Sequence, residues 1–244
     1  PMVESIQDQL KDAARRLSED CNRGVSRILK HPSVAYVTNP LDYAWDYHEQ
    51  FIDKWSVFGA KTLLLGMNPG PYGMAQTGVP FGATAMARNV LHIEEREVKT
   101  PLGAHPKRPV EGLSMQRQEV SGTRFWSMLA DHYGSTESIF SNIYVVNHCP
   151  LLLLGETGRN VTPVDLPQSV IEPVLKACDR HLKSVVDVMG IETVVGVGNY
   201  AKKRAKSILD GVRIDSMWHP SPASPLANRN GGADWRANAI SKIP

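Results

Sequence analysis

Apolar and polar positions follow two different periods along the chain, which predict helices in some segments and short buried strands in others. Over the first thirty residues apolar side chains recur every three or four positions, so we expect one amphipathic helix that begins near Ser5 and ends before Pro32. Further along, short apolar runs break off abruptly at glycine, proline or asparagine, as buried strands do. We expect such strands at residues 62–65, 143–146, 193–195 and 212–218.

Helical patterns separate these expected strands. Parallel strands need such crossovers, and the crossover helices cover both faces of the sheet. We therefore expect an α/β fold: a three-layer α/β/α sandwich around a central, mainly parallel four-stranded sheet. We assign residues 1–244 to a single domain, with an N-terminal helix (1–30) that packs on the core. The other expected helices cover residues 43–55, 83–91, 123–132, 167–189 and 200–209.

The composition narrows the class of protein. Of 244 residues, 42% are apolar and 21% charged, which excludes wholesale disorder. A formal net charge of +2 excludes a polybasic tail but leaves nucleic-acid binding open, because the clustering of basic residues decides that property. The three cysteines form no C-x-x-C pair, which predicts small buried side chains in a reducing compartment rather than disulfides or a zinc site.

The sequence shows no pattern typical of a membrane span, an export signal or a metal site. No apolar run reaches about 18 residues, and the start of the chain lacks the basic and apolar regions of a signal peptide. The histidines show no metal-ligand spacing, and His148 has no carboxylate partner in the pattern. We expect no metal and no cofactor, no membrane contact, and a location in a bacterial cytoplasm, or in the nucleus if the protein is eukaryotic, without secretion.

Polar residues that could bind a ligand or take part in catalysis follow three of the four expected strands. Asn68 follows the first in a Pro/Gly turn, Asn147 follows the second, and His219 follows the fourth. Open parallel sheets bind ligands beyond the carboxyl ends of their strands, so these side chains are expected to converge on one crevice. A carboxamide can recognise the edge of a planar ring, and an imidazole can stabilise charge on a carbonyl oxygen. Singly, each residue is more often a turn former or a structural histidine; their joint placement favours function.

The turn after the third expected strand allows two functional interpretations. Residues 196–201 read GVGNYA, which fits the G-x-G-x-x-A pattern of a dinucleotide-binding oxidoreductase, although that pattern normally opens its domain. Alternatively, Gly198 lies at a helix N-terminus that binds one backbone phosphate of a nucleic acid. For any single basic residue there, a solvated helix face is the simpler interpretation. The basic residues that would support phosphate binding are Lys202, Lys203, Arg204 and Lys206.

Three segments together resemble one enzyme family. The run GMNPGPYGMAQTGVPFG at residues 66–82 is similar to the water-activating loop of the single-strand-selective monofunctional uracil-DNA glycosylases. The HPSP run at 219–222 resembles the second signature of the uracil-DNA glycosylase superfamily, and NHCPL at 147–151 resembles its base-reading strand end. In order and spacing the resemblance extends from about Val57 to the end of the chain.

The resemblance implies a repair enzyme that removes uracil, and 5-substituted uracils, from DNA by base flipping and water attack. It implies that Asn68 positions the water and that His219 stabilises the departing uracil anion. It further implies that Asn147 reads the uracil edge and that Phe81 stacks on the base. Backbone groups of Met67 and Gly70 would shape the pocket. No lysine lies in these motifs, so a Schiff-base intermediate is not expected, and the enzyme would be monofunctional.

The chain departs from the family pattern at two positions. Tyr72 stands where the family commonly has Phe, and Ala223 stands where vertebrate relatives place Arg directly after the HPSP run. With Ala223 there, either Leu226 or Arg229 takes over as the inserted side chain, or insertion into the duplex is weaker. We assign the insertion to the loop 221–229. The resemblance implies uracil-containing DNA as the partner, single-stranded or duplex, and we expect a monomer. The alternative is an inactive nucleic-acid-binding module of the same fold. Loop residues assigned to DNA are Ser221, Pro222, Ala223, Leu226 and Arg229.

Overall fold

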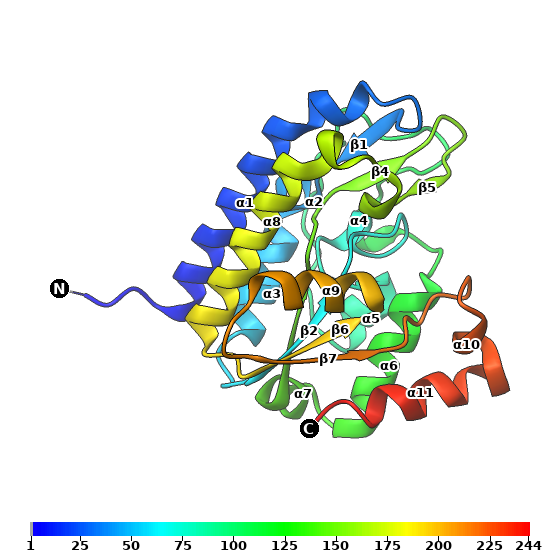
Figure 1. Ribbon diagram of the computed structural model, residues 1–244. Helices are drawn as coiled ribbons and strands as arrows, with labels where there is room; N and C mark the ends of the chain where they lie inside the picture. The colour runs from blue at the N-terminus through cyan, green and yellow to red at the C-terminus, as the bar shows by residue number, and fades with distance from the viewer. Residues whose placement is uncertain (1) are drawn as a thin grey trace.

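Residues 2–244, which the computed structural model describes, form two β-sheets and the helices that cover them (Figure 1). The larger sheet has four strands, all parallel, in the order β3-β2-β6-β7. The sequence predicted all four strands and their direction. Their bounds are β2 (Thr62–Gly66), β3 (Ile143–Asn147), β6 (Thr193–Val197) and β7 (Arg213–Met217).

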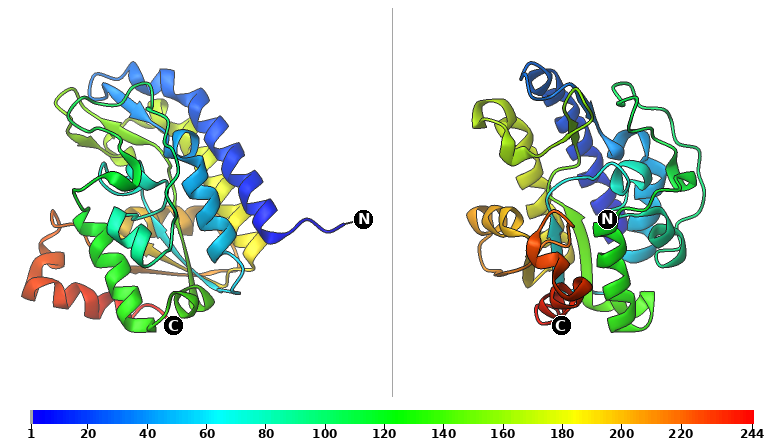
Figure 2. Two further views of the ribbon diagram at one scale, coloured as in Figure 1. Left: turned by 180° about the vertical axis from the view of Figure 1, so that it is seen from behind. Right: turned by 90° about the vertical axis from the view of Figure 1, so that its right-hand side faces the viewer.

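Helices cover both faces of this sheet, so the three-layer sandwich predicted from the sequence is confirmed. The right-hand view of Figure 2 shows α8 and α9 to one side of the sheet and α3 and α6 to the other. Every residue of β2 and β3 is buried, as expected for strands enclosed between two layers. The covering helices are α3 (Trp45–Trp55), α6 (Val120–Tyr133), α8 (Gln168–Met189) and α9 (Asn199–Ile208).

The N-terminal helix α1 (Ile6–Leu29) starts where the sequence predicted, because the Ser5 side chain accepts a hydrogen bond from the Asp8 backbone N–H at 3.1 Å. It runs antiparallel to α8 along its whole length (Figure 1). The two helices approach closely at Gly24, where an added Cβ would lie 2.4 Å from Val174 Cγ2. No helix within residues 2–244 is long and apolar enough to cross a lipid bilayer.

A second, antiparallel sheet was not predicted. It has the strand order β1-β4-β5, and its strands are β1 (Tyr36–Thr38), β4 (Leu152–Leu154) and β5 (Asn160–Val161). Strands of two or three residues are too short to show a period of two, so only their tertiary pairing defines them. This sheet matters for the site because β5 forms one wall of the cleft described below.

Several short helices complete the fold around the larger sheet. The helix expected at residues 83–91 is α5 (Thr84–Asn89), while the other short helices were not predicted. The remaining helices are α2 (Pro40–Tyr43), α4 (Met74–Thr77), α7 (Thr136–Asn142), α10 (Pro225–Asn228) and α11 (Ala233–Ile240), and the short 3₁₀ turns are Gly112–Ser114, Pro163–Asp165 and Arg229–Gly232.

The three cysteines are buried, as predicted, and they lie together. Burial raises the pKa of the Cys178 thiol, and the neighbouring thiols of Cys149 and Cys21 add to this effect. All three therefore behave as small apolar side chains in the part of the core between α1, α8 and the end of β3.

Replacement of Gly24 by alanine is expected to destabilise the protein. Alanine improves helix propensity by about 1 kcal/mol, but its Cβ at 2.4 Å from the stiff Val174 side chain forces α1 and α8 apart. We expect a net loss of about 1–2 kcal/mol in the free energy of unfolding, measured by urea denaturation. The double variant Gly24→Ala/Val174→Ala should recover part of this loss; a single variant as stable as wild type would contradict the close approach.

Candidate active site

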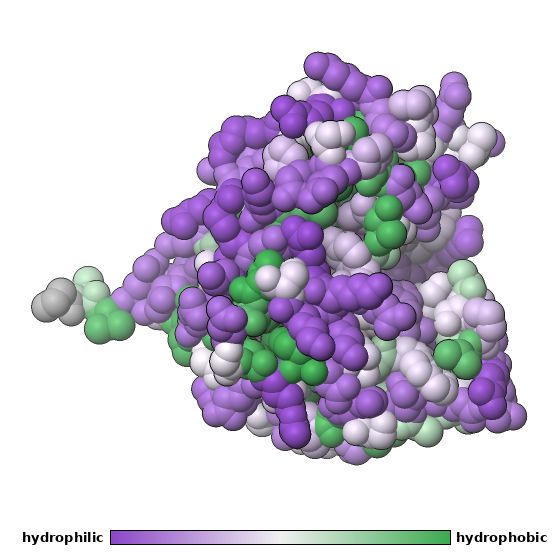
Figure 3. Space-filling model, in the orientation of Figure 1, coloured by the Kyte–Doolittle hydropathy of each residue, from purple (hydrophilic) through white to green (hydrophobic). Residues whose placement is uncertain are grey.

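A cleft of about 590 Å³ lies at the carboxyl ends of the parallel strands. Figure 3 shows the surface hollowed on this side, between the region of β5 and the region of α10. Asn68, Asn147 and His219 all line the cleft, so the structure brings together the three side chains that the strand ends predicted. Met67, Gly70, Phe81, Ser221 and Pro222 line it as well.

The Asn68 amide is held in one orientation. Its Nδ2 group donates a hydrogen bond to the Leu151 carbonyl at 3.1 Å, which leaves Oδ1 as the group available to a ligand. The turn that carries Asn68 is tied to the neighbouring strand end by the hydrogen bond from the Cys149 N–H to the Met67 carbonyl at 2.9 Å. A neutral amide oxygen can accept a hydrogen bond from a water molecule and orient it, but it cannot take up its proton.

Asn147 lies deeper in the cleft and depends on a glycine beside it. Its Nδ2 is 3.2 Å from the Met74 sulfur, and the side chain is buried. A Cβ on Gly66 would lie 2.1 Å from Asn147 Oδ1 and 2.9 Å from the Phe81 ring. The absence of a side chain at Gly66 therefore allows the Asn147 amide and the Phe81 ring to lie close to the Gly66 backbone.

Phe81 forms an aromatic wall of the cleft. Its ring stacks on Phe125 with centroids 4.3 Å apart and an interplanar angle of 16°. The backbone at Phe81 has φ of +55°, a left-handed conformation that is uncommon for a bulky residue. Gly122 packs against it, since a Cβ there would lie 2.2 Å from the Phe81 carbonyl oxygen. One face of the ring is thus covered by Phe125. The ring also lines the cleft, where its centroid is 6.3 Å from the centroid of the His219 ring.

His219 is a neutral hydrogen-bond donor at neutral pH. Its Nδ1 accepts the Ser221 backbone N–H at 3.0 Å, so the proton of the neutral ring resides on Nε2. Burial lowers the pKa of His219 to about 4. Gly198 packs under the ring, with its added Cβ position 3.6 Å from His219 Cβ, in a left-handed conformation with φ of +91°. This glycine supports the histidine.

The glycine-rich turn is filled by the protein's own backbone. A Cβ on Gly196 would lie 2.4 Å from the Lys202 backbone nitrogen, so this glycine permits close packing of α9 on the sheet. Lys202 is partly buried and Lys203 is exposed on α9, and neither lines the cleft. Arg204, which we expected to support phosphate binding, instead donates to both carboxylate oxygens of Asp179 at 2.8 and 2.7 Å.

The expectation that His148 has no carboxylate partner was wrong, because Asp179 lies beside it. His148 Nε2 is 2.7 Å from Asp179 Oδ1, and Tyr200 OH is 3.2 Å from His148 Nδ1. Burial lowers the pKa of His148 despite the neighbouring carboxylate, while His148 and Arg204 keep the pKa of Asp179 low against the effect of burial. The sequence could not reveal this network because its members are far apart along the chain.

The loop at 221–229 lies beside the cleft. Ala223 and Leu226 are exposed, whereas the Arg229 guanidinium pairs with Asp234 at 3.3 Å. Arg124 was not singled out from the sequence, yet it braces the loop: it donates to the Pro220 carbonyl at 2.9 Å and to Asn228 at 3.1 Å. The loop is therefore anchored to α6 at both of its ends.

Other cleft residues were also missed, because they lie in irregular segments without a period. The Arg117 guanidinium stacks 4.1 Å above the Tyr72 ring, and Arg108 and Arg159 also line the cleft. Glu119 is the acidic residue of this lining. Burial raises the pKa of Glu119, the Gly122 backbone N–H partly offsets that rise, and the resulting pKa is about 7.

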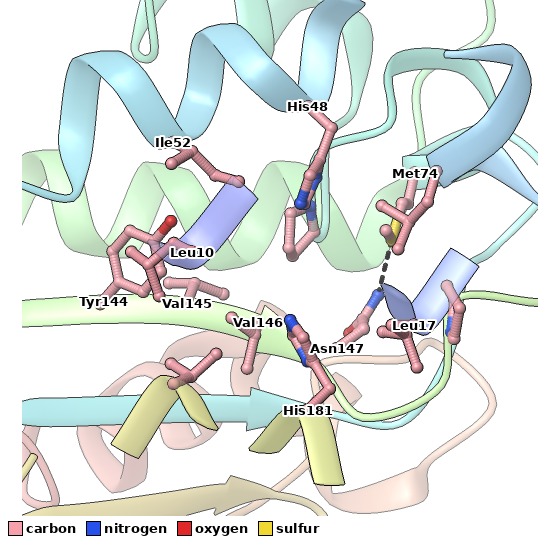
Figure 4. A pocket seen from close by; sticks show the side chains of 14 residues that line it. Leu10, Leu17, His48, Ile52, Met74, Tyr144, Val145, Val146, Asn147 and His181 are labelled. Carbon is pink, nitrogen blue, oxygen red and sulfur yellow. Dashed lines mark hydrogen bonds between the residues drawn. The ribbon is translucent and has the colours of Figure 1, made fainter. Parts of the chain in front are cut away.

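A small cavity of about 20 Å³ lies behind Asn147, in the core (Figure 4). His48 and His181 point toward it from α3 and α8. His48 Nδ1 donates to the Gly78 carbonyl at 2.7 Å, whereas His181 Nδ1 has no hydrogen-bond partner among the described residues. Burial lowers the pKa of His48 to about 4 and that of His181 to about 3, so both are neutral at neutral pH.

Together these features define a hydrolytic site: it can hold a planar ring, a water molecule and a carbonyl oxygen that gains negative charge. The family model described as the uracil DNA glycosylase superfamily matches residues 54–239. A single-strand selective monofunctional uracil DNA glycosylase of Bos taurus is 43% identical over 214 residues, covering 86% of this chain and 77% of the relative. Its Rattus norvegicus counterpart is 40% identical over 240 residues, covering 94% and 86%.

A solved structure agrees on the fold. The crystal structure of wild-type Pedobacter heparinus SMUG2 matches with a TM-score of 0.62 and 16% identity, over 87% of this chain and 88% of that one. The chain therefore belongs to the uracil DNA glycosylase superfamily and, within it, to the single-strand selective monofunctional family. The resemblance seen in the sequence is confirmed.

Acidification is expected to lower the free energy of unfolding, because the unfolded state protonates His48 and His181 more readily than the folded state. Their pKa values in the folded state lie below the unfolded value near 6.5, so the unfolded chain binds protons that the folded chain does not. The free energy of unfolding should fall as pH drops from about 6.5 toward 4, by up to ~1.4 kcal/mol per pH unit and histidine. His181→Leu should flatten this dependence in urea titrations; an unchanged slope would contradict the assignment.

Proposed function

We propose that this chain hydrolyses the N-glycosidic bond of uracil, and of 5-substituted uracils, in DNA and leaves an abasic site. The observation that carries this proposal is the convergence of Asn68, Asn147 and His219 on one cleft beside the Phe81 ring. Relatives at 40–43% identity bear the name uracil-DNA glycosylase, which supports the same reaction here. The glycosidic bond cannot be reached inside a duplex, so the nucleotide must be flipped into the cleft.

Recognition follows from the fixed amide of Asn147 and the aromatic wall. The flipped base stacks on Phe81, and Asn147 pairs its donor and acceptor with the 4-carbonyl and the ring N–H of uracil. Cytosine carries an amino group where uracil carries that carbonyl, so a donor would face a donor in a buried place. Leaving buried polar groups unpaired makes such discrimination large.

The chemical step uses a positioned water and a neutral imidazole. A water held by Asn68 Oδ1 attacks C1′ of the sugar as the bond from C1′ to N1 breaks, and the bonding electron pair departs with the uracil ring. His219 donates its Nε2–H to the carbonyl oxygen that gains the negative charge. Because this donor is neutral and already oriented by Ser221, it needs no reorganisation as the charge develops.

DNA is the substrate, and we propose that the cleft accepts both single strands and duplexes. Arg108, Arg117 and Arg159 line the cleft and supply positive charge for backbone phosphates. The loop at 221–229, anchored by Arg124, is the element that fills the gap left by the flipped base. We propose that the enzyme acts as a monomer. The inactive-module alternative is disfavoured by the intact orientation of Asn68 and His219.

The first test is base release from an oligonucleotide that carries one uracil, as a single strand and opposite guanine, with EDTA present. We expect strand cleavage only after alkali treatment, which reveals abasic sites. Asn68→Ala and His219→Ala should each slow single-turnover release by about 100-fold or more, since each removes a group that acts on the reacting atoms. No abasic sites from the wild type, on either substrate, would reject the proposed function.

Replacement of Gly66 by alanine tests whether activity depends on the close packing of the Gly66 backbone against Asn147 and Phe81. The added Cβ, 2.1 Å from Asn147 Oδ1, should displace the reading amide and reduce uracil release by about 100-fold while the protein remains folded. Gly155→Ala is the matched control, because the nearest atom to its added Cβ is 3.4 Å away. Equal activity of the two variants would show that Asn147 does not need its present position.

A further inference from the structure

Glu119 is enclosed at the point where the water-bearing turn meets α6. Added Cβ atoms on Gly70 and Gly73 would lie 2.3 and 2.4 Å from Glu119 Oε2, and one on Gly122 would lie 3.1 Å from Oε1. The carboxyl group thus occupies the space that three missing side chains leave. Gly70 lies two residues after Asn68 on the same turn, and Glu119 and Asn68 line the same cleft.

Within residues 2–244, no basic side chain forms an ion pair with this carboxyl group that would keep it permanently ionised. The causes that shift its pKa are burial, which raises it, and the Gly122 N–H, which lowers it; the resulting pKa is about 7, and no cation contributes. Arg117, two residues away, stacks on Tyr72 instead. A buried carboxylate without a cation is costly, so the group gains a proton readily at neutral pH. The charged or titratable side chains that share the cleft with it are Tyr72, Arg108, Arg117, Arg159 and His219.

The mechanism above leaves one proton without an acceptor. When the water oxygen bonds to C1′, it must lose a proton; the Asn68 amide cannot take it, and His219 Nδ1 is occupied by the Ser221 N–H. The departing uracil takes the electron pair and is held as an anion at its carbonyl oxygen. A carboxylate in the same cleft, next to the turn that holds the water, can accept this proton as a general base.

We propose that Glu119 accepts the proton of the attacking water, directly or through one further water, and this role rests on the proposed glycosylase function. In the step, the O–C1′ bond forms and the C1′–N1 bond breaks. The proton moves from the water to a Glu119 carboxylate oxygen, and it returns to solvent or to the uracil anion on product release. The charge balance holds, because one carboxylate is neutralised as one uracil anion appears.

Glu119→Gln tests this role without removing volume. The glutamine amide oxygen can still accept the Gly122 N–H and fill the space between the glycines, but it cannot accept a proton. We expect single-turnover uracil release to fall by about 100-fold at pH 8 while affinity for uracil-containing DNA changes less than threefold. The wild-type rate should rise with pH around a midpoint of about 7 and then level off, and this acidic limb should disappear in the variant.

Matched variants separate this role from a structural one. Glu111→Gln alters an exposed carboxyl outside the cleft and should leave rate and pH profile unchanged. Glu119→Asp keeps the carboxyl and should retain the acidic limb at a reduced rate. A Glu119→Gln protein that is folded, releases uracil at the wild-type rate and keeps the limb would overturn the proposal. So would a loss confined to DNA affinity. A wild type without any uracil release would instead reject the proposed function itself.

Discussion

The parallel register of β2 and β3 is the constraint on which the site depends. It pairs Gly66 with Asn147, and the ladder continues past the strand ends through hydrogen bonds from His148 to the Gly66 carbonyl and from Cys149 to the Met67 carbonyl. Two turns that are far apart in sequence are therefore held as one rigid unit. Asn68 and Asn147 project from this unit, so backbone hydrogen bonds fix the positions from which the two side chains extend.

Glycines allow close packing in and around this unit, because they have no side chain where other groups approach the backbone. Gly66 leaves space for the side chains of Asn147 and Phe81. Gly122 leaves space for the strained backbone of Phe81. Gly198 leaves space for the His219 ring. The left-handed conformation at Phe81 costs conformational energy and persists because the surrounding packing fixes it. Phe81 and Asn147 are buried at these close approaches, and polar interactions are stronger in a buried environment than in water.

Burial also sets the charge state of the cleft. It keeps His219 neutral and brings the pKa of Glu119 to about 7. The cleft therefore combines a neutral imidazole, a carboxyl group with a pKa near neutrality and three arginine side chains, those of Arg108, Arg117 and Arg159. A neutral imidazole with an oriented Nε2–H suits this arrangement, because a permanent cation at that depth would be costly to bury.

The sequence by itself determined the larger sheet, its flanking helices and the three polar strand ends, because short apolar runs, glycine stops and helical periods are local signals. It also determined the family, through the long run at residues 66–82. Only the tertiary structure decided the second sheet, the pairing of His148 and Arg204 with Asp179, and the position of Glu119 among three glycines. These features depend on contacts between segments that are far apart in the sequence. A local pattern of residues does not predict which distant segment will pack against it.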